Sequence, residues 1–295
     1  MPANFKEAPG YIDTEEALSA YYGPNSLACS GIRRLDETHV ESYFIVPENL
    51  CGPLARPPMF DRLRFHDDKV WVQTDDNDAK EHFIGSVVIN NTLIRIIPGH
   101  NLAGLAIEAA VQAYNRNREN PADLMLTEFG FIRYRGFVLP CQELVLTGAM
   151  LVNEKSISFS PDIMVAGQSK VKGNKFRLEV VDPLEKDLKS HMLAQHWLLE
   201  TTAQGFGSAV NPPKGMVPVL MQSERSQFGK TPIVTGDLIT TRLELLPSPS
   251  DQGFGNAEIF VNNIPYGTLR RLMVQFFPIE KIAEGIEAAR SIKLL

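Results

Sequence analysis

Apolar residues recur along this chain with two different periods, one typical of helices and one typical of strands. From Leu102 to about Asn115 they cover most of the circumference of a predicted helix, and many of them are alanines. Small side chains on nearly all sides indicate a helix that lies close to other backbone, as it does when a sheet wraps around it. The pattern predicts a second apolar helix from about Leu188 to Phe206.

Alternating runs typical of strands follow each predicted helix. They cover residues 127–135, 144–151, 157–166 and 176–181 after the first helix, and 222–228, 238–246, 257–261 and 268–277 after the second. Cys141 and Gly236 occupy equivalent turns, and the pair Asn262-Asn263 suits a turn with positive φ angles. The chain before residue 98 is less regular, with a short amphipathic stretch and three strand-like runs at 14–22, 40–46, 69–73 and 85–97.

Both helices carry a Glu and a Gln four residues apart, which places the two side chains on one helix face. The pairs are Glu108 with Gln112 and Glu200 with Gln204, 92 residues further on. The strands and turns repeat at nearly the same offset, which indicates a duplication. We expect an N-terminal extension at 1–25, a first unit with N-terminal strands at 26–182 and a second unit at 183–295. Because the second helix follows strand 176–181 almost directly, some N-terminal strands are expected to complete the second unit's sheet.

Composition narrows the functional classes. The chain has 295 residues, a formal net charge of -6 and 44% hydrophobic residues, which gives no reason to expect nucleic acid or an anionic membrane as a partner. No run approaches the roughly 20 apolar residues that span a bilayer. Three cysteines without metal-ligand spacing favour reduced thiols in a cytoplasmic protein. There is no glycine-rich phosphate loop, and the six His and three Cys form no zinc pattern, so the sequence argues against nucleotide and metal cofactors.

The order of these motifs resembles the hotdog fold. An apolar helix with Glu-x-x-x-Gln precedes Glu128-Phe129-Gly130-Phe131, and the second unit has the turn Thr235-Gly236-Asp237-Leu238 before a hairpin. More narrowly, the chain is similar to the β-hydroxyacyl-carrier-protein dehydratases of fatty-acid synthesis and to dehydratase domains of polyketide synthases. The resemblance implies an α+β double hotdog, in which each of two apolar helices is wrapped by an antiparallel sheet. Such a chain is a pseudo-dimer, and two chains could form a homodimer.

The same resemblance implies site residues. In that family a His before the helix takes the α-proton of a 3-hydroxyacyl thioester, and an acid on the partner unit's helix assists departure of the hydroxyl. Carried over, these roles pair His100 with Glu200, and His191 with Glu108. Gly104 would supply a backbone N–H to the thioester carbonyl, and the substrate-binding amides would be Gln112 and Gln204. Apolar neighbours such as Trp197 are expected to raise the pKa of the Glu200 carboxyl, so that it can donate a proton.

The sequence departs from the family pattern at the histidine. The family's His-Phe-Pro-Gly loop places that residue fourteen positions before the acid, where this chain has Ile94 and Lys186. His100 instead lies eight residues before Glu108, and His191 lies nine before Glu200. The second helix has His196 at the position that corresponds to Gly104, so a single site is favoured over two.

Each candidate also has a structural explanation. The helix glutamates could bond their own glutamines, the histidines could be ordinary hydrogen-bonding residues, and Gly104 could serve packing between helix and sheet. The predicted function is dehydration or isomerisation of a 3-hydroxyacyl thioester in fatty-acid or polyketide-type metabolism. The substrate would be carried on acyl carrier protein or coenzyme A, with no cofactor beyond that phosphopantetheine arm. The alternatives are a hotdog thioesterase or acyltransferase, and a non-catalytic module that binds acyl thioesters.

Overall fold

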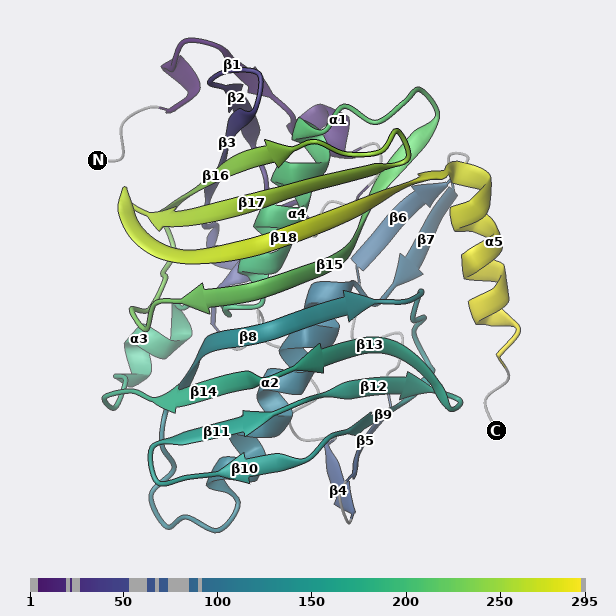
Figure 1. Cartoon of the computed structure of the whole chain (residues 1–295). Coiled ribbons are helices and arrows are strands. Elements are labelled where there is room, and N and C mark those ends of the chain that lie inside the picture. Colours follow the sequence, from purple (N-terminus) through teal and green to yellow (C-terminus); the bar gives the residue numbers. More distant parts are fainter. Residues whose placement is uncertain are drawn as a thin grey trace.

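Two apolar helices lie against one large antiparallel sheet in the computed structural model (Figure 1). The structure describes residues 5–19, 22, 27–52, 63–66, 69–73, 85–89 and 92–292. Helix α2 (Gly99–Asn115) packs on β8, β11, β13 and β14, and helix α4 (Trp197–Ala209) packs on β2, β3, β15 and β16. The two helices also contact each other. No helix in the described part of the chain is long and apolar enough to cross a membrane.

The strands form two halves, one around each helix. The half around α4 consists of β1 (Tyr11–Asp13), β2 (Gly31–Arg34), β3 (His39–Ile45), β15 (Met216–Phe228), β16 (Leu238–Leu246), β17 (Gln252–Val261) and β18 (Ile264–Pro278). The half around α2 consists of β4 (Arg64–His66), β5 (Lys69–Gln73), β8 (Leu124–Tyr134), β9 (Glu143–Thr147), β10 (Met150–Val152), β11 (Ser156–Phe159), β12 (Asp162–Val165), β13 (Gln168–Asn174) and β14 (Phe176–Val180). Pairing of β8 with β15 joins the halves, with Arg133 opposite Gln222 and Glu128 opposite Gln227.

The N-terminal region supplies strands to both halves. Strand β3 pairs with β16 from Leu238 opposite Ile45 to Glu244 opposite His39, and β5 pairs with β9. As predicted from the sequence, N-terminal strands complete the sheet of the second unit. The expected boundary at residues 26 and 182 would have grouped β2 and β3 with the first unit, whereas their hydrogen bonds place them beside α4.

Backbone angles at the turns support the duplication. Cys141 has a φ of 64° and the equivalent Gly236 has a φ of 87°, so the same left-handed turn occurs in both halves. Asn262 and Asn263 have φ angles of 52° and 66°, as predicted for that hairpin. Asparagine tolerates this region better than most residues, because its short polar side chain can bond locally.

The second predicted helix is interrupted. Instead of one helix over 188–206, the chain forms α3 (Lys186–Ser190), an irregular stretch, and then α4. In that stretch the Leu193 N–H bonds to the Ile233 carbonyl, and the Met192 carbonyl accepts the N–H of Gly52. The backbone therefore bonds to segments that are remote in sequence, which a local periodicity cannot reveal.

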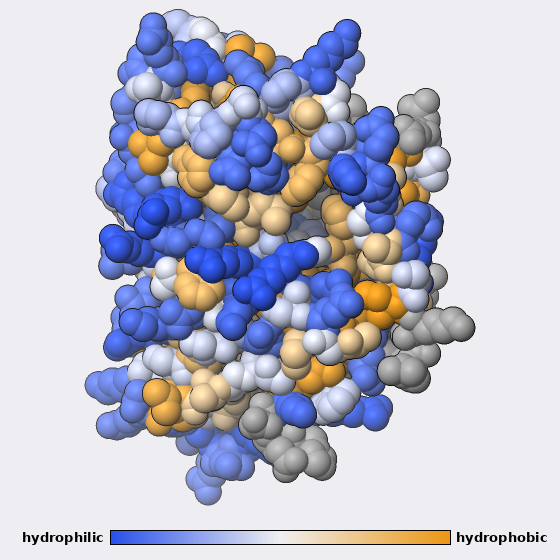
Figure 2. Space-filling model, turned by 45° about the vertical axis from the view of Figure 1, so that its right-hand side comes forward, coloured by the Kyte–Doolittle hydropathy of each residue, from blue (hydrophilic) through white to orange (hydrophobic). Residues whose placement is uncertain are grey.

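A separate hairpin and the last helix form a small satellite layer. The run 85–97 is a hairpin of β6 (Gly85–Ile89) and β7 (Thr92–Ile96), and helix α5 (Ile279–Arg290), which the pattern did not predict, follows β18. The short elements η1 (Phe5–Glu7), α1 (Glu15–Ser19) and η2 (Glu48–Leu50) lie nearer the N-terminus. The hairpin and α5 share an apolar cluster separate from the main core, which we call the satellite cluster; its buried members are Ile89, Leu139, Ile282, Ile286 and Ala289. Seen from the side of α5, the surface shows apolar residues around a hollow (Figure 2).

Candidate active site

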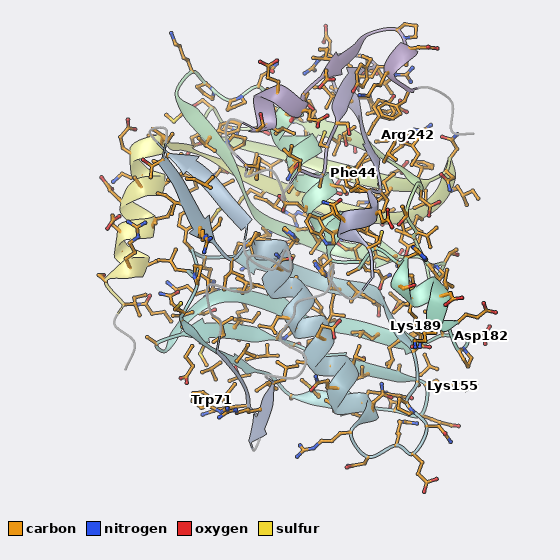
Figure 3. All side chains as sticks on the ribbon, turned by 180° about the vertical axis from the view of Figure 1, so that it is seen from behind. Phe44, Trp71, Lys155, Asp182, Lys189 and Arg242 are labelled. Atoms are coloured by element: carbon orange, nitrogen blue, oxygen red, sulfur yellow. The ribbon has the colours of Figure 1, made fainter. Side chains whose placement is uncertain are left out.

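The site begins where the two apolar helices start. Helix α2 opens directly after Pro98, whose carbonyl accepts the N–H groups of Asn101 and Leu102, and His100 lies in its first turn. Glu200 lies in the first turn of α4. Seen from behind, both helices cross the sheet, and Phe44 of β3 lies next to α4 (Figure 3). Contact between the helices brings residues from the two halves together.

His100 and Glu200 form a buried pair. Nδ1 of His100 lies 2.8 Å from Oε2 of Glu200, and the two side chains are 1% and 12% exposed. The imidazole also packs against Trp197, with ring centres 4.6 Å apart, and stacks on His196 at 5.7 Å. Burial among rings excludes water from this pair, which strengthens the attraction between a carboxylate and an imidazole.

A chain of hydrogen bonds continues from Glu200. Its Oε1 accepts a hydrogen bond from Nε2 of Gln204 at 2.8 Å, and Oε1 of Gln204 accepts the N–H of Ala28 at 2.7 Å. The Glu-x-x-x-Gln phrase of the second helix therefore does bond internally, as its structural explanation proposed. The same bond fixes the carboxylate beside His100 and ties it to the N-terminal segment.

The charge state of Glu200 differs from the expectation. Burial acts to raise the pKa of its carboxyl, but the attraction of His100 and the hydrogen bonding of His100 and Gln204 outweigh it, so the pKa lies below its ordinary value. The prediction from the sequence rested only on the apolar neighbours of Glu200, and it therefore gave the wrong direction for the pKa shift. At rest Glu200 is a carboxylate and His100 is its partner.

A cavity of about 180 Å³ adjoins this pair. His100 and Glu200 line it together with two tyrosines, Tyr22 and Tyr134. Burial, reinforced by the negative charge of Glu200, raises the pKa of both phenols, so their hydroxyls remain protonated. Most other lining residues are apolar and come from α2, α4, β15, α5 and the β6–β7 hairpin.

Besides Nδ1 of His100, which faces Glu200, the cavity-lining residues contribute two polar atoms that are buried without a hydrogen-bond partner among the described residues. They are Nε2 of His100 and the hydroxyl of Tyr134. Buried polar atoms are rarely left unpaired, because each one loses its hydrogen bonds to water. Both atoms belong to cavity-lining residues, so they are the groups best placed to meet a bound molecule.

The mirror pair is not assembled. His191 is exposed after α3 whereas Glu108 lies in the middle of α2, and no ion pair joins them in the described structure. Neither residue lines the cavity, nor does Gln112. The structure therefore brings together one of the two predicted pairs, His100 with Glu200.

Gly104 has a packing role. A Cβ at this position would lie 2.6 Å from Nδ1 of His196, so a glycine is needed for α4 to approach α2. Gly104 does not line the cavity. Gly99 and His100, at the start of α2, do line it, and a Cβ on Gly99 would lie 2.6 Å from the ring of Tyr134.

The sequence did not single out Tyr134 or Tyr22. Tyr134 is the last residue of β8 and follows Arg133, and alternation along a strand places the two side chains on opposite faces. This inward position was the feature of the sequence that could have indicated Tyr134 as a site residue. No group of three His, Cys, Asp or Glu side chains in the described part of the chain is arranged to hold a metal ion.

No protein-family model matches the sequence, and no curated protein matches it. Among solved structures, the acyl-CoA thioesterase II TesB2 from Mycobacterium marinum is similar with a TM-score of 0.50 at 7% identity, covering 73% of this chain and 96% of that chain. The dehydratase domain from the CurJ module of curacin polyketide synthase gives 0.49 at 8% identity, covering 78% and 99%. The PpsC dehydratase domain from Mycobacterium tuberculosis, in complex with C12:1-CoA, gives 0.45 at 11% identity, covering 78% and 100%. The likeness concerns the fold, and the chain has the hotdog fold.

Proposed function

We propose that this protein is an acyl-thioester enzyme in which two hotdog units in tandem form one site. Its proposed reaction is dehydration of a 3-hydroxyacyl chain carried on the phosphopantetheine arm of acyl carrier protein or coenzyme A. One observation carries the proposal: a buried His100–Glu200 pair, made from both units, lies beside a mostly apolar cavity.

His100 is the proposed base. With the Nδ1–H held by the Glu200 carboxylate, the lone pair of a neutral imidazole lies on Nε2. That nitrogen, without a protein partner among the described residues, takes the proton from the carbon next to the thioester carbonyl. Glu200 stabilises the imidazolium that forms, as a buried carboxylate beside a His does.

The hydroxyl on the next carbon must leave as water. As the C–H bond breaks, the carbon–carbon double bond forms and the C–O bond breaks, so the hydroxyl needs one proton. Because the pKa of Glu200 is lowered, its carboxyl holds no proton at rest; the proton comes from the imidazolium, directly or through Glu200. The pair thus returns to its starting state after each turnover.

The start of α2 is suited to the thioester carbonyl. A helix leaves its first N–H groups without intrahelical partners and carries a partial positive charge there. Pro98, Gly99 and His100 at this end all line the cavity. The N–H groups of Gly99 and His100 would stabilise the negative charge that develops on the carbonyl oxygen.

Thioester hydrolysis is the second candidate, and the ionised state of Glu200 favours it. A carboxylate–imidazole pair activates water by the same proton transfer and needs no acid at rest. The two reactions differ in the product: dehydration gives an enoyl thioester, and hydrolysis gives a free thiol.

The test is to incubate the protein with 3-hydroxyacyl, crotonyl and saturated acyl thioesters while following enoyl absorbance and thiol release. Enoyl interconversion without thiol release is expected. Thiol release without enoyl change would identify a thioesterase, and no change in either signal would favour a non-catalytic acyl-binding module.

Matched variants locate the site in the same assay. Glu200→Gln is expected to lower turnover by about 100-fold or more, since the base loses its carboxylate partner. Glu108→Gln makes the same change in the equivalent phrase of the other helix and should leave turnover nearly unchanged. Equal losses in both variants would contradict a single site.

A further inference from the structure

We infer that helix α5 and the β6–β7 hairpin limit the length of the acyl chain, with Ile282 as the principal limiting residue. The inference rests on the proposed function and adds the substrate class: aliphatic chains of bounded length that carry no polar group beyond the reacting carbons. Ile279 and Ile282 of α5 and Ile89 and Ile96 of the hairpin line the same cavity as the His100–Glu200 pair.

The cavity connects two separate apolar clusters. Leu102 and Leu199, near the pair, belong to the main core, whereas Ile89 and Ile282 belong to the satellite cluster. A chain whose reacting carbons lie at the pair can therefore extend from the main core into the satellite cluster. Because the sheet of β6 and β7 is separate from the large sheet, side-chain packing rather than strand pairing holds this wall together.

The wall selects for hydrocarbon. Besides Glu200 and His100, the described lining residues include no charged side chain and no amide side chain. A chain ending in a carboxylate or an amide would lose its hydration there without gaining a partner, so it is expected to bind more weakly than a hydrocarbon chain of the same length. Each methylene group buried against the wall instead contributes about 0.8 kcal/mol, or roughly fourfold in affinity.

Helix α5 is held at both ends, so the wall has a defined position. It continues from β18 at Pro278, and near its end the Ala289 carbonyl accepts a hydrogen bond of 2.9 Å from Nε2 of Gln142. Oε1 of the same buried Gln142 accepts the N–H of Leu139 at 2.9 Å. A Cβ on Gly285 would lie 3.2 Å from the ring of Phe137, so the helix also packs closely at its middle.

The volume indicates a short to medium chain. A water molecule occupies about 30 Å³ of liquid, so a cavity of about 180 Å³ takes roughly six groups of that size. We expect affinity to rise with chain length up to about six carbons and to stop rising beyond it.

The experiment measures binding, without chemistry. S-alkyl pantetheine thioethers of four to sixteen carbons can be neither dehydrated nor hydrolysed, and their dissociation constants are measured by calorimetry. Ile282→Ala removes three carbons from the wall and is expected to move the break in affinity to longer chains by two or three carbons. Ile282→Phe adds volume and is expected to move the break to shorter chains.

Ile286→Ala is the matched control. Ile286 is also buried on α5, in the same cluster, but it does not line the cavity. It should lower the melting temperature as Ile282→Ala does and leave the break in place. A break that does not move in either Ile282 variant, or that moves equally in Ile286→Ala, would overturn the role of α5 alone. Absence of binding at every length would overturn the proposed function together with it.

Discussion

At the scale of the residue, His100 and Glu200 each determine what the other can do. The carboxylate fixes which imidazole nitrogen carries the proton, and the imidazole keeps the carboxyl ionised against the effect of burial. The placement of His100 beside Glu200 was predictable from the sequence, because the family resemblance paired these two residues across the units. The charge state of Glu200 was not predictable, since His100, the partner that lowers its pKa, lies 100 residues away in the sequence.

This coupling predicts a pH dependence of stability. The pKa of Glu200 is lower in the folded than in the unfolded state, so the unfolded chain binds more protons between the two values. The stabilising contribution is therefore present above the ordinary Glu pKa of 4.5 and is lost as the pH falls through the folded value. Urea unfolding should show that the difference in free energy of unfolding between the wild type and Glu200→Gln shrinks on acidification. A difference that grows on acidification would contradict this prediction.

A second prediction concerns the hydroxyl of Tyr134. It is buried without a hydrogen-bond partner among the described residues, so Tyr134→Phe should not lower the melting temperature. If the hydroxyl contacts substrate, turnover should fall by about tenfold, the value of one lost hydrogen bond. The control is Tyr114→Phe, whose hydroxyl donates to the Glu154 carbonyl: it should lose stability and retain turnover. Unchanged turnover in Tyr134→Phe would remove this hydroxyl from the site.

At the scale of the element, the close contact of α2 with α4 sets the geometry of the pair. The repeated helices, the Cys141 and Gly236 turns and the Asn262-Asn263 hairpin were predictable, because helix periodicity and positive φ angles are local properties. The break before α4 and the position of α5 were not. Met192 and Leu193 are apolar and compatible with a helix, and only contacts with remote strands divert them.

Gly104→Ala tests the helix contact. The new Cβ would lie 2.6 Å from the His196 ring, so the ring or α4 must move, at a cost of about 1–3 kcal/mol and with misalignment of His100 and Glu200. Gly207→Ala is a milder change in α4, with its nearest contact 3.3 Å away at Pro218. Thermal unfolding and turnover should both fall further in Gly104→Ala; the reverse order would show that this contact does not position the pair.

At the scale of the whole molecule, the half around α4 is not a continuous segment of the chain, whereas the strands around α2 all lie within residues 64–180. Strands β2 and β3 complete the sheet around α4, although about 150 residues separate Ile45 from the start of that helix at Trp197. Pairing of β8 with β15 then makes one sheet from both halves. Gln195 adds to the junction, because it bonds to the N–H and the carbonyl of Leu126 and to the hydroxyl of Tyr266.

Separating the chain at residue 182 tests this arrangement. Residues 183–295 alone lack β3, which leaves the edge of β16 without its partner and α4 partly uncovered. We expect this fragment to be insoluble or unfolded by circular dichroism, and to recover structure when residues 1–182 are expressed with it. A fragment that folds cooperatively alone would show that the N-terminal strands are dispensable.

The pairing of β3 with β16 has a consequence for synthesis. Ile45 is opposite Leu238, so the ribosome must add 193 further residues before this partner exists. At about 5–20 residues per second the wait is roughly 10 to 40 s. Throughout that time strand β3 has an open edge, which other chains could join. Growth temperature and chaperone supply should therefore affect the yield of this protein more than its final stability would predict.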